Sequence, residues 1–128
     1  MTYHFSKTID RSFDQAVEDV TAALQEIGFG ILCTIPVSEK LKGALDVDIP
    51  RYTILGACNP SFAYRALQCE NKIGVMLPCN FVIQQKEDGK VEVSAVDPIA
   101  SMAAIKNADL GALATEVQGL IKGVIDKL

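Results

Sequence analysis

The chain of 128 residues lacks several features that would assign it to a large functional class. It has no run of about 18 apolar residues, so no segment is expected to span a membrane. Its N-terminus lacks the basic and then apolar segments of a secretory signal, and a cytoplasmic location is therefore expected. Acidic residues number 16 against 12 Lys and Arg, which gives a net charge of −4, and the basic residues form no cluster. Binding to a nucleic-acid backbone is therefore not expected.

Common catalytic and metal-binding patterns are also missing. His4 is the only histidine, which excludes a zinc site of several histidines within one chain. The four cysteines form no Cys-x-x-Cys pair, and no glycine-rich phosphate-binding motif occurs. The acids of the predicted loops fit no calcium-binding loop and are interpreted as solvated. These acids are Asp10, Asp46, Asp48 and Asp97.

The residues that are present favour one globular domain covering 1–128. Hydrophobic residues make up 49% of the chain and charged residues 22%, which is typical of such a domain. Apolar alternation and apolar runs predict strands at 3–9, 30–36, 52–58, 73–77, 80–86 and 90–96. Helical spacing predicts helices at 13–27, 38–45, from Pro60 onward, 99–105 and 110–128. This order predicts an α+β fold with a mostly antiparallel sheet and helices packed on one face.

Local signals support several of these elements. Ser12 is expected to cap the first long helix, and Asn59 is expected to cap the helix that Pro60 opens. Gly56 and Gly74 fall inside predicted strands, where glycine indicates a bulge or the close approach of another group.

Two cysteine–asparagine pairs beside prolines are the strongest indication of a functional site. In Cys58-Asn59-Pro60, the cysteine precedes a predicted helix N-terminus, where backbone N–H groups lower the pKa of a thiol. In Pro78-Cys79-Asn80, the cysteine follows a break between predicted strands, which leaves backbone groups free to face a ligand. Arg65 lies within two turns of the helix start and could reach an anion bound there. The candidate ligand-binding residues are Cys58, Asn59, Pro60, Arg65, Pro78, Cys79 and Asn80, and the two thiols are the candidate metal ligands.

Three interpretations of this site remain open. The first is a module that binds a small ligand, a metal ion or a sulfur species and has a thiol of low pKa near Cys58 and Cys79. The second is a thiol-dependent redox or transfer enzyme that uses Cys58 together with Cys79. The third is a dimeric interaction protein, joined through the terminal helix at Gly119 and Gly123, in which the cysteines are structural. Cysteine is often a buried packing residue, and Cys33 and Cys69 are interpreted in that way.

Several of these segments resemble a known family. They are Tyr52–Pro60, Ala63, Ala66-Leu67, Ile73–Asn80, Val96-Asp97-Pro98 and Met102. Together they resemble the bacterial and archaeal family called domain of unknown function 302, and the resemblance covers nearly the whole chain. It implies a fold similar to that of the TATA-binding protein, with a curved antiparallel sheet and helices on one side. It also implies a homodimer, and it carries no activity.

Overall fold

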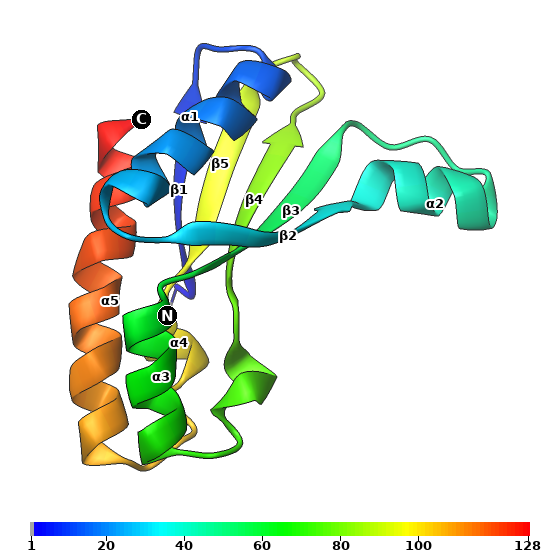
Figure 1. Cartoon of the computed structure of the whole chain (residues 1–128). Coiled ribbons are helices and arrows are strands. Elements are labelled where there is room, and N and C mark those ends of the chain that lie inside the picture. Colours follow the sequence, from blue (N-terminus) through cyan, green and yellow to red (C-terminus); the bar gives the residue numbers. More distant parts are fainter. Residues whose placement is uncertain (1) are drawn as a thin grey trace.

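The computed structural model describes residues 2–128 as a five-stranded sheet with helices (Figure 1). The strands are His4–Ile9 (β1), Gly30–Pro36 (β2), Tyr52–Cys58 (β3), Cys79–Gln85 (β4) and Val91–Val96 (β5). The helices are Phe13–Glu26 (α1), Val37–Leu45 (α2), Pro60–Cys69 (α3), Pro98–Ser101 (α4) and Ala108–Lys127 (α5), with a 3₁₀ turn at Ile73–Met76 (η1). None of these helices is both long and apolar enough to cross a bilayer.

The sheet has the order β1-β5-β4-β3-β2, and all neighbouring strands are antiparallel. Helices α1 and α5 lie across one face of it (Figure 1). Side chains alternate along the central strands, so Phe81, Ile83 and Val93 are buried against these helices while Val82 and Ser94 face the other side. The prediction of an α+β fold with helices on one face is therefore confirmed.

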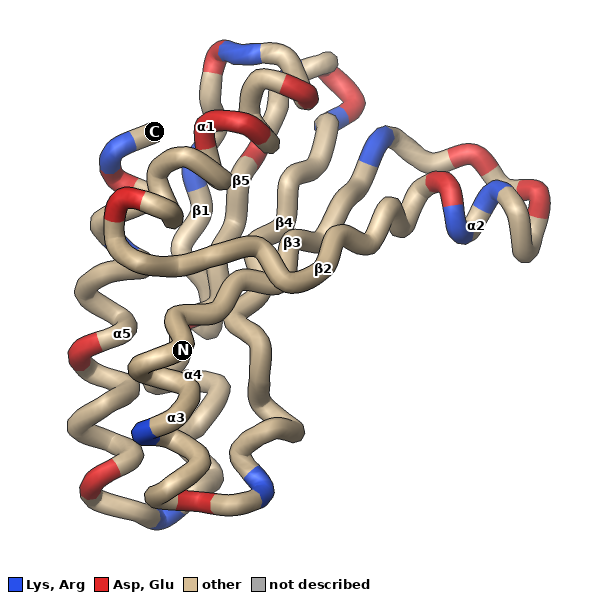
Figure 2. The backbone as a smooth tube through the Cα atoms, viewed as in Figure 1, with Lys and Arg blue, Asp and Glu red and all other residues tan. Residues whose placement is uncertain are grey.

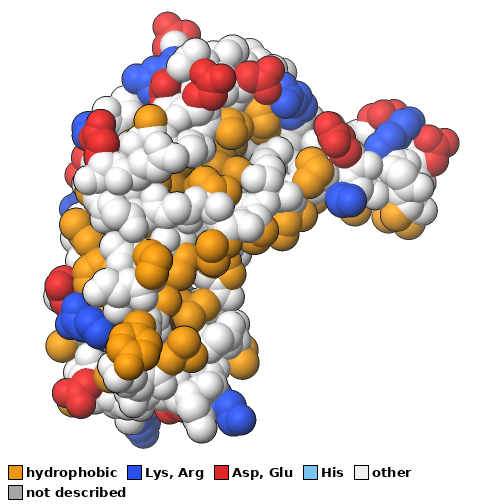
Figure 3. All heavy atoms as spheres, viewed as in Figure 1, with side chains coloured by type: hydrophobic (Ala, Val, Ile, Leu, Met, Phe, Trp, Pro, Cys, Tyr) orange, Lys and Arg blue, Asp and Glu red, His pale blue; other side chains and the backbone are white. Residues whose placement is uncertain are grey.

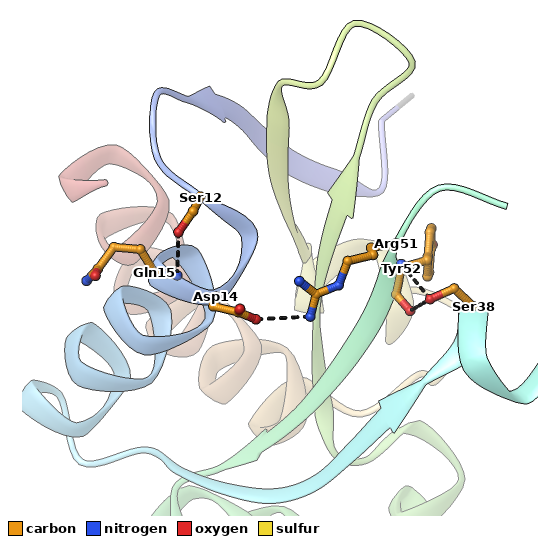
Figure 4. Close-up of polar contacts among 6 residues, drawn as sticks. All are labelled: Ser12, Asp14, Gln15, Ser38, Arg51 and Tyr52. Atoms are coloured by element: carbon orange, nitrogen blue, oxygen red, sulfur yellow. Dashed lines mark hydrogen bonds and ion pairs between the residues drawn. The ribbon is translucent and has the colours of Figure 1, made fainter.

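Helix α1 begins where the sequence predicts, because Ser12 satisfies one of its free backbone donors. The Oγ of Ser12 accepts a hydrogen bond from the N–H of Gln15 at 3.1 Å (Figure 4). The side-chain amide of Gln15 donates a hydrogen bond to Asp19 at 2.8 Å. Arg51, which directly precedes β3, pairs with Asp14 at 3.0 Å and so ties α1 to the sheet (Figure 4).

Residues 37–50 form an arm that extends away from the rest of the molecule (Figure 1). Its base is attached to β3 because the Oγ of Ser38 accepts a hydrogen bond from the N–H of Tyr52 at 3.1 Å (Figure 4). Near its tip Lys42 pairs with Asp46 at 2.9 Å, and charges of both signs gather there (Figure 2). Helix α2 contains no buried residue.

The prediction of a strand at 73–77 is wrong, because Ile73–Met76 forms the 3₁₀ turn η1. A strand there would extend β4 past Ala57, the β3 residue that pairs with Cys79, and the chain turns into α3 just beyond that point. No strand partner would be left for its backbone groups. A Cβ at Gly74 would meet no atom within 4 Å, so the close approach of another group predicted at this glycine is not found.

Two predicted helix boundaries also shift. The predicted helix at 99–105 is confined to Pro98–Ser101. Helix α5 starts at Ala108, two residues earlier than predicted, because the Oδ1 of Asn107 accepts a hydrogen bond from the N–H of Leu110 at 3.2 Å.

Candidate functional site

The adjacent ends of β3 and β4 meet helices α3, α4 and α5 around an apolar cavity of about 40 Å³. We call this cavity the thiol pocket. Residues of the strand ends, of helices α3 and α5 and of the segment after α4 line it, among them Ala57, Cys58, Asn59, Ala63, Ala66, Pro78, Cys79, Met102, Ala114 and Val117. The small alanine side chains leave the space open. The three shorter helical elements α3, η1 and α4 contain one charged residue, Arg65, so this region carries little charge (Figure 2).

Cys58 and Cys79 both line the pocket, are half-buried and form no disulfide. The register explains their proximity, since Ala57 pairs with Cys79 and Cys58 is the next residue. Burial raises the pKa of Cys58. Burial, with a smaller contribution from the charge of Cys58, raises the pKa of Cys79 from 9.0 to about 11. The expectation of a thiol with a lowered pKa is therefore not met.

Asn59 explains why the start of α3 does not activate the neighbouring thiol. Its Oδ1 accepts hydrogen bonds from the N–H groups of Ser61 and Phe62, at 3.0 and 3.2 Å. These are the donors that would otherwise stabilise a thiolate at Cys58. The prediction that Asn59 caps this helix is confirmed, and the cap itself removes the expected activation.

Two polar side chains hold the helices around the pocket. The Nδ2 of Asn107 donates to the carbonyl of Cys69 at 2.9 Å, which joins the start of α5 to the end of α3. The Oδ1 of Asp97 accepts hydrogen bonds from the N–H of Ile99 at 3.0 Å and from Gln118 at 3.1 Å, which joins α4 to α5. Asp97 is 9% exposed, so its interpretation as a solvated loop acid is wrong. Both hydrogen bonds fall on Oδ1, so protein groups satisfy this oxygen of the carboxylate.

The predicted site residues separate into two groups. Cys58, Asn59, Pro78 and Cys79 come together in the thiol pocket. Asn80 lies on the opposite face of the sheet, because successive side chains of a strand point to opposite sides.

Pro60 and Arg65 lie on exposed parts of α3 and are not among the residues that line the pocket. The guanidinium of Arg65 pairs with Glu116 of α5 at 3.3 Å, so it is directed to the neighbouring helix and away from the helix start. Met102, which no cysteine motif marks as a site residue, also lines the pocket. Only its place in the family resemblance singled it out.

Gly56 is a point of close approach, as predicted for a glycine within a strand. A Cβ there would lie 2.6 Å from the Sγ of Cys33 and 2.8 Å from the Cγ of Pro78. Pro78 can therefore pack directly over β3 beside the pocket. The prediction that Cys33 is a packing residue is wrong, since its side chain is exposed. Cys33 lies on the edge strand β2, on the face that α1 and α5 leave open.

The open face of the sheet carries a chain of hydroxyl and imidazole groups. The Nδ1 of His4 lies 2.7 Å from the Oγ of Ser6, which in turn lies 2.7 Å from the Oγ of Ser94. They border a shallow hollow of about 310 Å³. Glu92 on this face accepts a hydrogen bond from Gln84 at 3.4 Å. This arrangement lacks the base–acid geometry of a catalytic triad.

Residues 2–128 contain no group of three or more His, Cys, Asp or Glu side chains that could hold a metal ion. The two predicted metal ligands, Cys58 and Cys79, both line the thiol pocket.

Comparison with known proteins gives a consistent result at the level of family and fold. Residues 5–128 match the profile of the family described as "Domain of unknown function DUF302". A crystal structure of an uncharacterized conserved protein DUF302 from Bacillus stearothermophilus has a TM-score of 0.92 at 24% identity, and the match covers 98% of both chains. That likeness establishes the fold.

An uncharacterized protein of Aquifex aeolicus is 32% identical over 75 residues. The match covers 59% of this chain and 46% of the relative, so it spans about half the length of that protein.

Proposed function

Because the chain belongs to the DUF302 family, whose name carries no activity, its function has to be argued from its own residues, and we propose that it is a small-ligand-binding module. The thiol pocket is the proposed binding site. The observation that carries this proposal is the convergence of Cys58 and Cys79 on one apolar cavity.

The dimensions of the pocket support a compact ligand. A site for one water needs about 10–15 Å³, so a cavity of about 40 Å³ accommodates a group of a few heavy atoms. Apolar walls with a small number of polar or reactive groups are the usual composition of a binding site. A ligand that reacts with sulfur or coordinates it would bind best here, because Cys58 and Cys79 line the cavity.

A thiol-dependent enzyme has less support than a binding module. A nucleophilic cysteine needs a large thiolate fraction near neutral pH. Burial raises the pKa of both Cys58 and Cys79, which lowers that fraction.

Protein purified without oxygen tests the binding proposal. Native mass spectrometry measures any retained ligand, and amide chemical shifts follow titration with dimethyl sulfide, a small apolar probe. We expect binding in the unaltered chain and its loss in Ala63→Leu, whose larger side chain fills the pocket. Ala112→Leu places the same side chain on the exposed surface of α5 and should bind normally.

The proposal fails if no mass is retained and the probe shifts no signals around Ala63, Ala114 and Val117. It also fails if Ala63→Leu binds as well as Ala112→Leu.

A dimeric interaction protein is the second candidate function, and the arm is the observation that favours it. Helices shorter than about 12 residues are marginal in water unless they pack against something. Helix α2 has nine residues and no buried side chain. The arm carries Leu45, which is 66% exposed, together with the exposed Val47 and Ile49. Apolar side chains also gather in the angle between the arm and the helices below it (Figure 3). We propose that a second copy of the chain covers this surface.

A further inference from the structure

We propose that the thiol pocket holds a soft monovalent metal ion, Cu⁺, through the sulfur atoms of Cys58, Cys79 and Met102. This inference rests on the proposed binding function and names the chemical class of the ligand.

Three residues that carry sulfur, from three different segments, line the cavity. Cys58 ends β3, Cys79 begins β4 and Met102 directly follows α4. The pairing of Ala57 with Cys79 places the two cysteines on neighbouring strand ends. The cavity has a volume of about 40 Å³, and Cys58, Cys79 and Met102 are all among the residues that line it. Two thiols and a thioether form an all-sulfur donor set.

The remaining lining offers almost no competing ligand. Asn59 is its one amide, and the Oδ1 of that residue already accepts two backbone hydrogen bonds. Asp97 precedes the lining residue Pro98 but does not itself line the pocket, and its Oδ1 accepts hydrogen bonds from Ile99 and from Gln118. Ions such as Ca²⁺ and Mg²⁺ require several oxygen ligands. The pocket therefore disfavours hard cations.

Coordination number distinguishes Cu⁺ from Zn²⁺. Structural zinc takes four nitrogen or sulfur ligands from Cys and His. Residues 2–128 contain no site with even three of the side chains His, Cys, Asp or Glu. Thiolate and thioether donors suit both Cu⁺ and Zn²⁺. Cu⁺ is favoured here because two or three sulfur ligands are enough for it.

Binding is a proton exchange without electron transfer. The thiols of Cys58 and Cys79 each release a proton to the buffer, and each sulfur donates an electron pair to the ion. The neutral thioether of Met102 donates a lone pair and has no proton to release. Copper stays in the +1 state throughout, and no sulfur is oxidised.

Anaerobic titration of the reduced, metal-free chain with Cu⁺ against the chelator bicinchoninate tests the proposal. Charge-transfer absorption of the thiolate–copper bond provides a second readout. We expect one ion per chain and its loss in Cys79→Ser. Met102→Leu, which keeps the volume and removes the sulfur, should weaken binding by about tenfold or more, because losing even a partner outside the ligand shell usually costs about that much.

Matched controls use sulfur residues that do not line the pocket. Cys69→Ser replaces another half-buried cysteine, and Met76→Leu replaces an exposed methionine of η1. Both should bind as the unaltered chain does. The proposal is overturned if the chelator keeps all the copper, if Cys79→Ser binds normally, if Met102→Leu matches Met76→Leu, or if Zn²⁺ binds as tightly as Cu⁺.

The dimethyl sulfide titration distinguishes a failure of copper binding from a failure of the binding function, because it needs no metal. If copper fails to bind while the probe still shifts the pocket signals, the ion is the wrong ligand and the binding function stands. If both fail, the binding function fails as well.

Discussion

Access to water differs sharply among the cysteines, and this difference governs what each thiol does. Cys33 is exposed on the open face of the sheet, whereas Cys58 and Cys79 are half-buried at the pocket. Burial disfavours the charged thiolate and so raises the pKa of both pocket thiols. Their environment favours protonated or ligand-bound sulfur over free thiolate.

Alkylation rates should follow this order. With iodoacetamide at pH 7, we expect Cys33 to react first and Cys79 last, as measured by mass spectrometry of the digested peptides. The rate at Cys79 should continue to rise up to a pH of about 11, where its thiol ionises. A rate at Cys79 that levels off below pH 8 would show an activated thiol and contradict the assignment.

The raised pKa of Cys79 also predicts how stability depends on pH. The unfolded thiol ionises near pH 9.0 and the folded one near pH 11, so the unfolded state loses its proton first. The stabilising contribution is fully present below pH 9.0 and disappears as pH rises to about 11. Its size is about 2–3 kcal/mol for two pKa units.

Urea unfolding of the reduced protein at several pH values measures this contribution. Cys79→Ala should lose less stability than the unaltered chain between pH 9.0 and about 11. Equal losses in both proteins would show that other groups cause the effect.

Gly56 is the residue at which a single methyl group should matter most. In Gly56→Ala the added Cβ would meet the Sγ of Cys33 at 2.6 Å and the ring of Pro78 at 2.8 Å. The cysteine side chain can rotate away, but the proline ring is fixed to the backbone. Overpacking of this kind typically costs about 1–3 kcal/mol of unfolding free energy. Chemical denaturation measures the cost, and Gly74→Ala, in open space, is the matched control.

At the scale of elements, the cap of α3 is the interaction that links local structure to the pocket. Removing the side-chain oxygen in Asn59→Ala leaves the N–H groups of Ser61 and Phe62 without their acceptor. The expected loss is about 1 kcal/mol of unfolding free energy. Asn59→Asp keeps the acceptor and should restore stability, and the exposed Asn71→Ala should change little. A stable Asn59→Ala variant would mean that water replaces the cap.

At the scale of the whole molecule, the arm should determine the state of assembly. We expect light scattering to give twice the chain mass of 13.8 kDa. Leu45→Lys should weaken this dimer by about tenfold or more, because a buried leucine contributes about 1.5–3 kcal/mol. Ala44→Lys places the same charge on a neighbouring exposed residue of α2 and provides the control.

Helix α5 offers a competing dimer surface at Gly119 and Gly123, where an added Cβ meets nothing within 4 Å. Gly119→Leu tests that surface directly. If Gly119→Leu abolishes the dimer and Leu45→Lys does not, the interface lies on α5 and not on the arm.

The sequence by itself was sufficient for most of the fold. Apolar periodicity located the boundaries of β2 and β3, and the caps Ser12 and Asn59 located the starts of α1 and α3. These signals are local, since a cap or an alternation acts within a few residues. The segment at 73–77 was misassigned because a strand also needs a partner, and its composition does not show whether one is left.

For the candidate site too, some features follow from local sequence and others depend on tertiary packing. The sequence marked Cys58 and Cys79, and their neighbours Asn59 and Pro78, from their motifs alone. Only the tertiary structure decided that these four share one pocket with Met102, that Asn80 faces the other side and that Arg65 pairs with α5. It also reversed the expected pKa shift of Cys58, because the pKa of a thiol depends on burial and on which groups already use the helix donors. Burial and proximity arise from packing between distant segments, and no local pattern encodes them.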